Sequence, residues 1–338
     1  MAEFYPSPQS EQHNNETLVQ STLTGEENTT PNKNGALTPI AYLWTRTVPC
    51  PNPTCGATIP LVRQTWLSKK KGNYLALRMI PDYATKQIRF KESQAAKPEE
   101  LGFDPEEGSR RGNATCLFCG AIATANYAKE QGQKNNIGRK LMVVVLTRQG
   151  SQGKIYLTGD KIEALCGEED KLKAHIDTLC NQYELKLPTE SVPQYLTGGT
   201  CYPYGITRFV DLFTSRQLFA LLAFSAEIRH AHTVMLEEGI DINRATAITT
   251  YLGLMVDKLA DRNSTICRWD NSRETIANTY ARQALPMVWD FAEVNPFGGA
   301  SGGIAGALKW IIEAIQNLVM SGQPSLVFRA SASQVPLE

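Results

Sequence analysis

Two pairs of cysteines constrain the fold of this chain more than any other feature of its sequence. Cys50 and Cys55 lie in the string CPNPTCG, and Cys116 and Cys119 lie in the string CLFCG. Each short loop lets two thiolates face one point, and two such turns complete a tetrahedral site of four sulfurs. The glycine after each second cysteine allows a tight knuckle in which backbone N–H groups approach the sulfurs. The pattern is typical of a zinc ribbon, so we predict a structural Zn²⁺ held by these four cysteines.

The main energetic cost of such a site is the loop of 60 residues between Cys55 and Cys116. Closing it costs roughly 3–4 kcal/mol, whereas structural zinc contributes about 10–16 kcal/mol at neutral pH. The alternative is a set of four buried free cysteines. No histidine lies near the pairs, and four thiolates leave no coordination position open for catalysis. The other four cysteines stand alone and are interpreted as packing residues: Cys166, Cys180, Cys201 and Cys267.

The charge of the chain is balanced overall but uneven along its length. Lys and Arg total 34, and so do Asp and Glu, which excludes a uniformly basic protein that coats nucleic acid. Residues 39–150 contain 17 basic against 8 acidic residues, a net charge of +9, whereas residues 1–38 and 151–338 carry −4 and −5. A polyanion is therefore expected to dock on the segment that carries the cysteine pairs.

Two groups of cations in this segment are candidates for contacts with phosphates. Three consecutive lysines lie between aromatic residues just beyond the first knuckle, and two arginines lie just before the second. If one metal ion joins the knuckles, these cations can share one face that binds DNA. The alternative is a solvated loop with ordinary surface lysines. The candidate DNA-binding residues are Lys69, Lys70, Lys71, Arg110 and Arg111.

The chain divides into four parts, which together predict an α+β fold. Residues 1–38 are polar and lack apolar periodicity, so we expect a disordered tail. Residues 39–158 contain short strand patterns, including a hairpin of 140–148 with 154–158, and make up the zinc ribbon with its β-hairpins. Residues 159–206 predict a helix and an extended connector. Residues 207–338 predict a mainly helical region.

Periodicity and capping residues locate the expected helices. The first covers 160–183, the second follows the capping box of Thr214 and Gln217, and the third is capped by Asp241 or Asn243. A fourth is expected to start near Ser272. A last helix over 301–320 is expected to face inward with Ile304, Leu308, Ile311, Ile315 and Leu318.

The expected cellular location follows from the absence of a membrane-spanning run and of a signal peptide in the sequence. No apolar run approaches the roughly 18–20 residues that span a bilayer, and the first residues do not resemble a signal peptide. Eight cysteines without an export signal indicate thiols or metal rather than disulfides. We therefore expect a cytoplasmic protein with no membrane partner.

Two further patterns each allow two interpretations. The string NPFGGASGG over 295–303, which contains Gly298–Gly303, fits a flexible connector, and it also fits a cradle for an anionic ligand at a helix N-terminus. Charged residues and tryptophans at 261–263, 268–270, 282–283 and 289–290 fit an ion-pair network between helices, and alternatively a cleft for DNA. The sequence has no G-x-x-x-x-G-K-[ST] string, which excludes a P-loop nucleotidase.

Several long strings, in one order, resemble those of the zinc-ribbon-containing adenine-specific DNA methylases. They are YLWTRTVPCPNPTCGATIPL over 42–61, PYGIT over 203–207, DLFTSRQL over 211–218 and ARQALPMVWDFAEVNPF over 281–297. The resemblance covers roughly residues 40–330. It implies a ribbon inserted in a Rossmann-like, S-adenosylmethionine-dependent methyltransferase that acts on adenine N6 in DNA.

The chain departs from that family at both catalytic motifs. No cofactor loop of the Asp-Pro-Phe-x-Gly-Gly-Gly kind precedes Cys50, and no Pro-Pro pair occurs, so the [Asn/Asp/Ser]-Pro-Pro-Tyr motif is missing. The resemblance therefore implies the middle segment of a methylase, inactive alone, whose partner polypeptides carry the remaining methyltransferase parts. No catalytic or cofactor-binding residue is assigned. The rivals are a non-enzymatic zinc-ribbon nucleic-acid-binding protein and an unusual complete methyltransferase that binds its cofactor at Gly298–Gly303.

Overall fold

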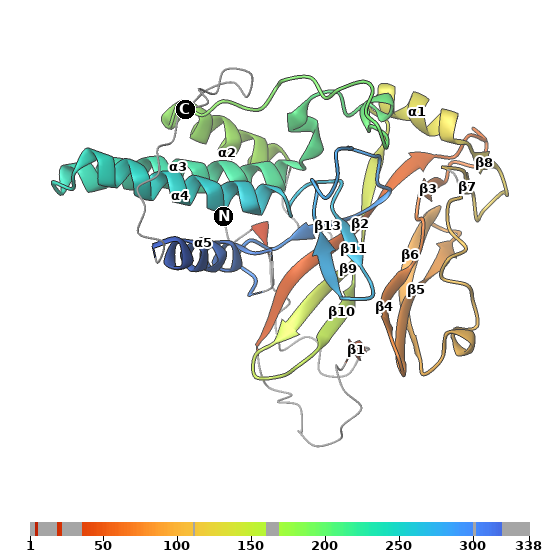
Figure 1. Cartoon of the computed structure of the whole chain (residues 1–338). Helices are drawn as coiled ribbons and strands as arrows, with labels where there is room; N and C mark the ends of the chain where they lie inside the picture. The colour runs from red at the N-terminus through yellow and green to blue at the C-terminus, as the bar shows by residue number, and fades with distance from the viewer. Residues whose placement is uncertain are drawn as a thin grey trace.

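A computed structural model describes residues 4–5, 19–21, 36–110, 112–159, 169–299 and 302–319 of the chain. Its largest element is a curled sheet in the order β1 (Val19–Ser21), β10 (Lys154–Thr158), β9 (Gly138–Arg148), β2 (Leu37–Pro49) and β13 (Asp290–Val294). All its paired strands run antiparallel, and β3 (Thr58–Pro60) pairs with the far end of β2. The register of β2 against β9 shifts twice, and such bulges bend a strand and increase its twist. The α+β class predicted from the sequence is confirmed (Figure 1).

A smaller antiparallel sheet covers one face of the curled sheet. It consists of β4 (Trp66–Lys70), β5 (Asn73–Asp82) and β6 (Gln87–Ala95). Alternate apolar residues of the two sheets form one core, as the period of two in a strand requires. From the small sheet they include Leu75, Leu77, Ile88 and Phe90, and from the curled sheet Val143, Val145 and Tyr156.

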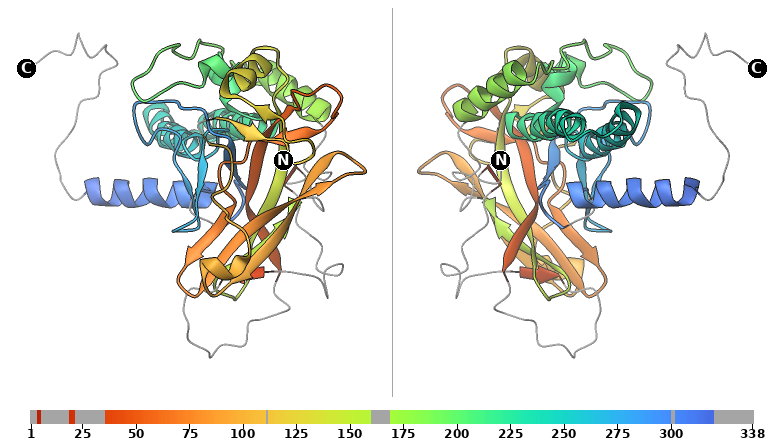
Figure 2. Two further views of the ribbon diagram at one scale, coloured as in Figure 1. Left: turned by 90° about the vertical axis from the view of Figure 1, so that its right-hand side faces the viewer. Right: turned by 90° about the vertical axis from the view of Figure 1, so that its left-hand side faces the viewer.

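Helices cover the opposite face of the curled sheet (Figure 1). Leu172 and Ile176 of α2 (Glu169–Gln182), with Leu218 and Leu222 of α3 (Ser215–Glu237), pack on strand residues such as Val144. Helix α4 (Ile242–Ala260) packs on α3, and α5 (Ile304–Val319) packs on α4. Figure 2 shows α5 projecting away from both sheets. None of the helices within the described residues is long and apolar enough to cross a bilayer.

Short elements complete the fold. The hairpin β7 (Ala114–Thr115) and β8 (Ile122–Ala123) is followed by α1 (Ala125–Gln133), and the hairpin β11 (Arg268–Asp270) and β12 (Thr275–Ala277) lies beside β13. In the part of the chain that the structure describes, 3-10 helices cover Pro98–Leu101, Tyr202–Tyr204 and Phe209–Leu212.

Several predicted boundaries are confirmed. The hairpin over 140–158 is β9 with β10. Thr214 and Gln217 form the expected capping box of α3, and the Asp241 carboxylate caps α4 by accepting the N–H groups of Asn243 and Arg244. The predicted helix over 160–183 appears as α2 from Glu169 onward, and residues 160–168 lie outside the described part of the chain.

Three expectations are wrong in detail. No helix starts near Ser272, because the Asp270 carboxylate accepts the N–H groups of Ser272 and Arg273 and so closes a tight turn between β11 and β12. On α5, Leu308 and Leu318 do not face inward but are 38% and 66% exposed, because within the described residues this helix packs mainly on α4. In the expected disordered tail, Phe4 and Tyr5 are buried in the main core.

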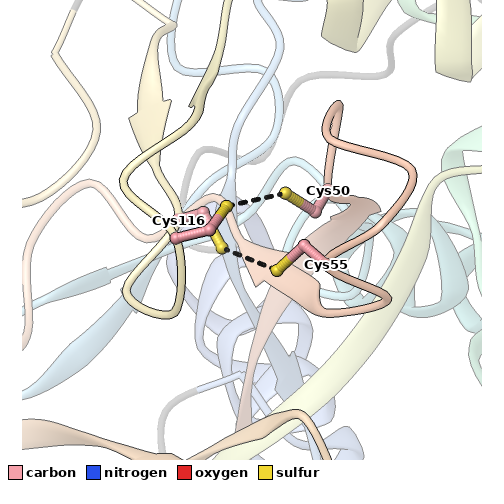
Figure 3. A group of neighbouring side chains, drawn as sticks. Cys50, Cys55 and Cys116 are labelled. Atoms are coloured by element: carbon pink, nitrogen blue, oxygen red, sulfur yellow. Dashed lines mark hydrogen bonds between the residues drawn. The ribbon is translucent and has the colours of Figure 1, made fainter.

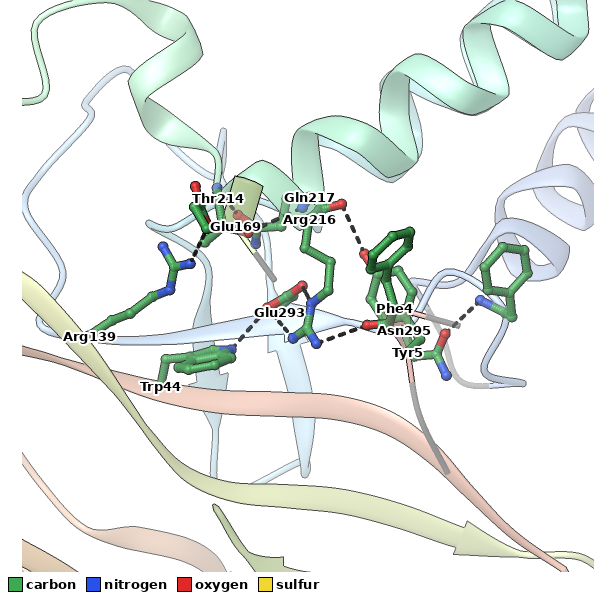
Figure 4. Close-up of polar contacts among 11 residues, drawn as sticks. Phe4, Tyr5, Trp44, Arg139, Glu169, Thr214, Arg216, Gln217, Glu293 and Asn295 are labelled. Carbon is green, nitrogen blue, oxygen red and sulfur yellow. Dashed lines mark hydrogen bonds and ion pairs between the residues drawn. The ribbon is translucent and has the colours of Figure 1, made fainter. Parts of the chain in front are cut away.

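A buried ion pair explains why the N-terminal residues Phe4 and Tyr5 are held. The guanidinium of Arg216 donates to the Glu293 carboxylate twice, at 2.6 and 2.8 Å, and to the carbonyl of Phe4 at 3.1 Å (Figure 4). The indole N–H of Trp44 donates to the same carboxylate at 2.9 Å. Both charged side chains are almost fully buried. This pair therefore joins α3, β13 and the N-terminal residues inside the core.

Removal of one partner of this pair should destabilise the fold strongly. We expect Glu293→Gln to lower the free energy of unfolding by about 3–5 kcal/mol, because Arg216 is left buried without a countercharge. Urea denaturation measures the change. The matched control is Glu313→Gln, which removes the exposed i,i+4 pair with Lys309 and should cost less than about 0.5 kcal/mol. Equal losses of stability in the two variants would contradict the role assigned to the buried pair.

Candidate functional site

The four paired cysteines converge on one point, as the sequence predicts. Their sulfurs all lie within 4.8 Å of one another. Cys50 Sγ lies 3.6 Å from Cys119 Sγ, and Cys55 Sγ lies 3.9 Å from Cys116 Sγ (Figure 3). A tetrahedral zinc site with Zn–S bonds of about 2.3 Å has sulfurs about 3.8 Å apart. The sulfur positions therefore fit a single metal ion at their centre.

Each cysteine pair lies in a backbone turn of knuckle type. The N–H of Cys50 donates to the carbonyl of Ala57, and the N–H of Cys116 donates to the carbonyl of Ala121, both at 2.8 Å. Gly56 and Gly120 have φ of 67° and 75°, a conformation that residues with a side chain rarely adopt. The two glycines that follow the second cysteine of each pair thus have the role that the sequence predicts.

The sulfurs differ in their electrostatic surroundings. Burial raises the pKa of the Cys50 thiol to about 12, although the N–H of Asn52 acts in the opposite direction. The N–H of Ala121 lowers the pKa of Cys119 to about 7. Four sulfurs at this spacing can all be thiolates at neutral pH only if a cation compensates their charge. The donor set therefore fits a cation that prefers sulfur, and it leaves no ligand position for a substrate.

The cysteine turns are built on a small core of their own. Apolar residues from the end of β2, β3, β7, β8 and α1 surround the cluster, among them Ile59, Leu61 and Ala128. The hydroxyl of Tyr127 on α1 donates to the carbonyl of Pro49, directly before Cys50, at 3.1 Å. The first turn is thus a continuation of the longest strand, and the second is attached to it through α1.

The structure brings only some of the predicted DNA-binding cations to a free surface. Lys69 forms an ion pair with Glu106 at 2.6 Å and lies over the ring of Trp66. Lys70 forms an ion pair with the buried Glu274 at 2.5 Å, so its charge stabilises the fold. Lys71 and Arg110 are exposed, and Arg111 lies outside the described residues.

A hollow of about 760 Å³ lies beside β4, between four segments distant in sequence. They are 63–69, 106–110, 268–271 and 287–291. The hairpin β11–β12 forms one wall, because the indole N–H of Trp269 donates to the carbonyl of Leu67 and the N–H of Lys69 donates to the carbonyl of Asn271. Of the four stretches that the sequence offers for a DNA cleft, 268–270 and 289–290 line this hollow, and 261–263 and 282–283 do not.

One acidic group of the hollow, the carboxyl of the half-buried Asp290, has a buried oxygen. The Oδ2 atom of Asp290 accepts the N–H of Arg63 at 2.8 Å, and Oδ1 is buried with no hydrogen-bond partner. Thr45 on β2 is paired with Asp290 on β13. Its hydroxyl donates a hydrogen bond to the carbonyl of Arg46. Burial raises the pKa of Asp290 to about 7, against the lowering effect of the Arg63 N–H. This carboxyl is therefore partly protonated at neutral pH.

The glycine-rich loop that was a candidate cofactor cradle is attached to the curled sheet. The side-chain amide of Asn295 donates to the carbonyl of Pro39, and its oxygen accepts the N–H of Phe297. A side chain at Gly298 would meet the carbonyl oxygen of Pro39 at 3.0 Å. Residues 300 and 301 lie outside the described chain. The described part of the loop thus packs on the start of β2.

Comparison with known proteins identifies no relative from which a function could be inferred. No family model, curated protein or solved structure matches it. The four-cysteine cluster and the neighbouring hollow are therefore the two features of the described residues that bear on function.

The raised pKa of Asp290 predicts a pH dependence of stability. The pKa of Asp290 is about 3.9 in the unfolded chain and about 7 in the folded one. The contribution of this group to stability is therefore fully present below about pH 4 and is lost as pH rises to about 7. We expect the difference in free energy of unfolding between the wild type and Asp290→Asn to change with pH. As pH rises from about 4 to about 7, the wild type should lose up to about 1.4 kcal/mol per pH unit relative to the variant. Chemical denaturation at several pH values measures it.

Asp270→Asn is the matched control for this experiment. Burial raises the pKa of Asp270, but hydrogen bonds from Ser272 and Arg273 outweigh it, so the net pKa is lowered. The contribution of Asp270 is then already present above about pH 4 and is lost only as pH falls. A difference curve for Asp290→Asn that is as flat as this control between pH 4 and 7 would contradict the assignment.

Proposed function

We propose that this chain is a zinc-ribbon segment of an adenine-specific (N6) DNA methyltransferase, which contacts DNA and gives structural support. The observation that carries the proposal is the four-cysteine cluster, whose sulfurs fit one tetrahedral ion. Zinc is the first choice, because tetrahedral sites of four thiolates select zinc or iron, and structural zinc sites are closed by four protein ligands. The zinc ribbon lies within residues 39–158, and the mainly helical part follows it.

Contact with DNA is supported by charge. The segment that holds the cluster carries the +9 excess, and Lys71 and Arg110 are exposed in it. Arg63 and Arg268 lie at the same hollow as Arg110. Arginine and lysine at this density suit the phosphates of a nucleic acid.

The methyltransferase assignment is supported by the strings that resemble that family. Neither its cofactor loop nor a Pro-Pro-Tyr motif occurs in these 338 residues, so S-adenosylmethionine and the methyl transfer belong to partner polypeptides in this proposal. The Rossmann-like part of the family also belongs to them, because the paired strands of the curled sheet are antiparallel and a Rossmann sheet is mainly parallel.

An exposed apolar surface on the helices supports such partners. On α5, Trp310 is 65% exposed and Ile312 and Leu318 are also exposed, and on α4 Tyr251 and Leu254 are exposed. Apolar side chains in such numbers on neighbouring helices are typical of a surface that another polypeptide covers.

The second candidate is a non-enzymatic zinc-ribbon protein that binds nucleic acid. It is favoured by the closed cluster, which leaves no coordination position for catalysis. Neighbouring reading frames distinguish the two candidates. Frames that carry the cofactor loop and the Pro-Pro-Tyr motif favour the methyltransferase, and their absence favours the second candidate.

Zinc content tests the metal. We expect about one zinc per chain by elemental analysis, and its loss in each of the variants Cys50→Ser, Cys55→Ser, Cys116→Ser and Cys119→Ser, because structural sites require all four ligands. Cys180→Ser, on α2 and away from the cluster, is the control and should keep the metal. Full zinc content in Cys116→Ser would contradict the site.

The salt dependence of binding tests the contact with DNA. We expect Lys71→Gln to bind duplex DNA more weakly, with a salt slope reduced by about 0.9 for the one phosphate that the variant no longer neutralises. Fluorescence anisotropy at several salt concentrations measures it. Lys69 and Lys70 are left intact because they form ion pairs with Glu106 and Glu274. Lys309→Gln, exposed on α5, is the control, and a slope unchanged in Lys71→Gln would exclude this lysine from the interface.

A further inference from the structure

The hollow beside β4 has a lining that the metal site does not explain. Three tryptophans, from three different segments, contribute to it: Trp66, Trp269 and Trp289. Trp66 is buried, whereas Trp269 and Trp289 are half-buried and can be reached by a ligand. Three of the five tryptophans of the chain thus lie at one hollow. Its volume of about 760 Å³ is within the range of about 300–1,000 Å³ found for sites that bind small molecules.

The rings of Trp269 and Trp289 are held in place by contacts with neighbouring residues. Trp269 is oriented by its 2.8 Å hydrogen bond to the Leu67 carbonyl, and the ammonium of Lys154 lies 5.0 Å from its ring. Trp289 packs edge-to-face on Tyr204, with ring centroids 5.2 Å apart. Rings fixed in this way lose little freedom when a planar ligand stacks on them.

The charge that remains available at the hollow is positive. Four basic residues line it, Arg63, Lys69, Arg110 and Arg268, against three acidic ones, Glu106, Asp270 and Asp290. Lys69 is paired with Glu106. Arg110 and Arg268 are both exposed, and neither guanidinium forms an ion pair with any residue in the described parts of the chain. Guanidinium groups bind phosphate through two parallel hydrogen bonds.

We propose that the hollow binds one unstacked nucleotide of a single-stranded nucleic acid. The base stacks on the half-buried indoles of Trp269 and Trp289, and Arg110 and Arg268 bind the phosphates on either side of it. Sites for single strands combine aromatic platforms with a cationic track in this way. An acidic peptide would also be attracted by the arginines, but it would not use the two indole surfaces. This inference rests on the proposed function and specifies which form of the nucleic acid the hollow takes.

The test uses the full chain and a labelled single-stranded DNA of 12 nucleotides. Fluorescence anisotropy is measured over a range of salt concentrations for the wild type and for Arg110→Ala/Arg268→Ala, whose exposed side chains can be removed without disturbing the core. We expect at least tenfold weaker binding and a salt slope reduced by about 1.4, which is about 0.7 for each of two phosphates. Arg273→Ala is the control, because this exposed arginine lies in the same hairpin but does not line the hollow.

The aromatic part of the site is tested separately. Trp269→Ala should weaken binding of the oligonucleotide at least about fivefold, as expected for one stacking partner. Trp310→Ala, which removes an exposed tryptophan on α5, should leave it unchanged. Adenosine monophosphate is the probe for a free nucleotide. Binding of the monophosphate as tight as that of the oligonucleotide would overturn the assignment to a strand.

The outcomes separate this inference from the proposed function. If duplex DNA binds through Lys71 while binding of the oligonucleotide does not change in the Arg110→Ala/Arg268→Ala variant, the hollow inference is overturned and the contact with DNA stands. If the oligonucleotide depends on both arginines but duplex DNA does not bind, the hollow inference stands and the duplex contact is wrong. Binding of a poly-glutamate peptide in place of the oligonucleotide would also overturn it.

Discussion

The convergence of four cysteine sulfurs is the interaction on which the arrangement of the first half of the chain depends. It joins the end of β2 to a turn 60 residues further along, with the small sheet β4–β5–β6 between them in sequence. The segment around the cluster has only a small apolar core. Such a small core does not offset the entropy cost of closing the loop, whereas a metal bound by the four sulfurs would. The small sheet itself is positioned by the apolar core that it shares with the curled sheet.

The remainder of the molecule is organised by the curled sheet. Its strands alternate between residues that face the small sheet and residues that face the helices, so both faces are buried. The ion pair of Arg216 and Glu293 lies on the helical side and also binds the N-terminal residues. The cysteine turns, the hollow and the projecting α5 are thus separate regions on one scaffold. This separation is consistent with a segment that contacts nucleic acid at one place and another polypeptide at a different one.

Local signals in the sequence predicted the local features. Two short cysteine loops with glycines were sufficient to identify the four-sulfur cluster, because each knuckle is set by residues close in sequence. The capping box at Thr214 and the Asp241 cap were found for the same reason. The turn after Asp270 was mistaken for a helix start, since a carboxylate followed by Ser272 suits both. The distinction depends on β11 pairing with β12.

Features that join distant residues could not be predicted in the same way. Arg216 and Glu293 are 77 positions apart, and no pattern in a single sequence pairs them. Phe4 and Tyr5 lie in a polar segment, and their burial is explained only by their contacts with Arg216 and the core around it. The hollow combines four segments, of which the sequence indicated two as an alternative. Lys70 was grouped with its neighbours by charge, although strand alternation directs it to Glu274 instead.

The nature of the metal shell is the most direct test of this account. X-ray absorption at the zinc edge of the purified chain measures which atoms surround the ion and at what distance. We expect the zinc ion to have four sulfur neighbours at about 2.3 Å and no nitrogen or oxygen neighbour. A shell that contains nitrogen or oxygen, or fewer than four sulfurs, would contradict it.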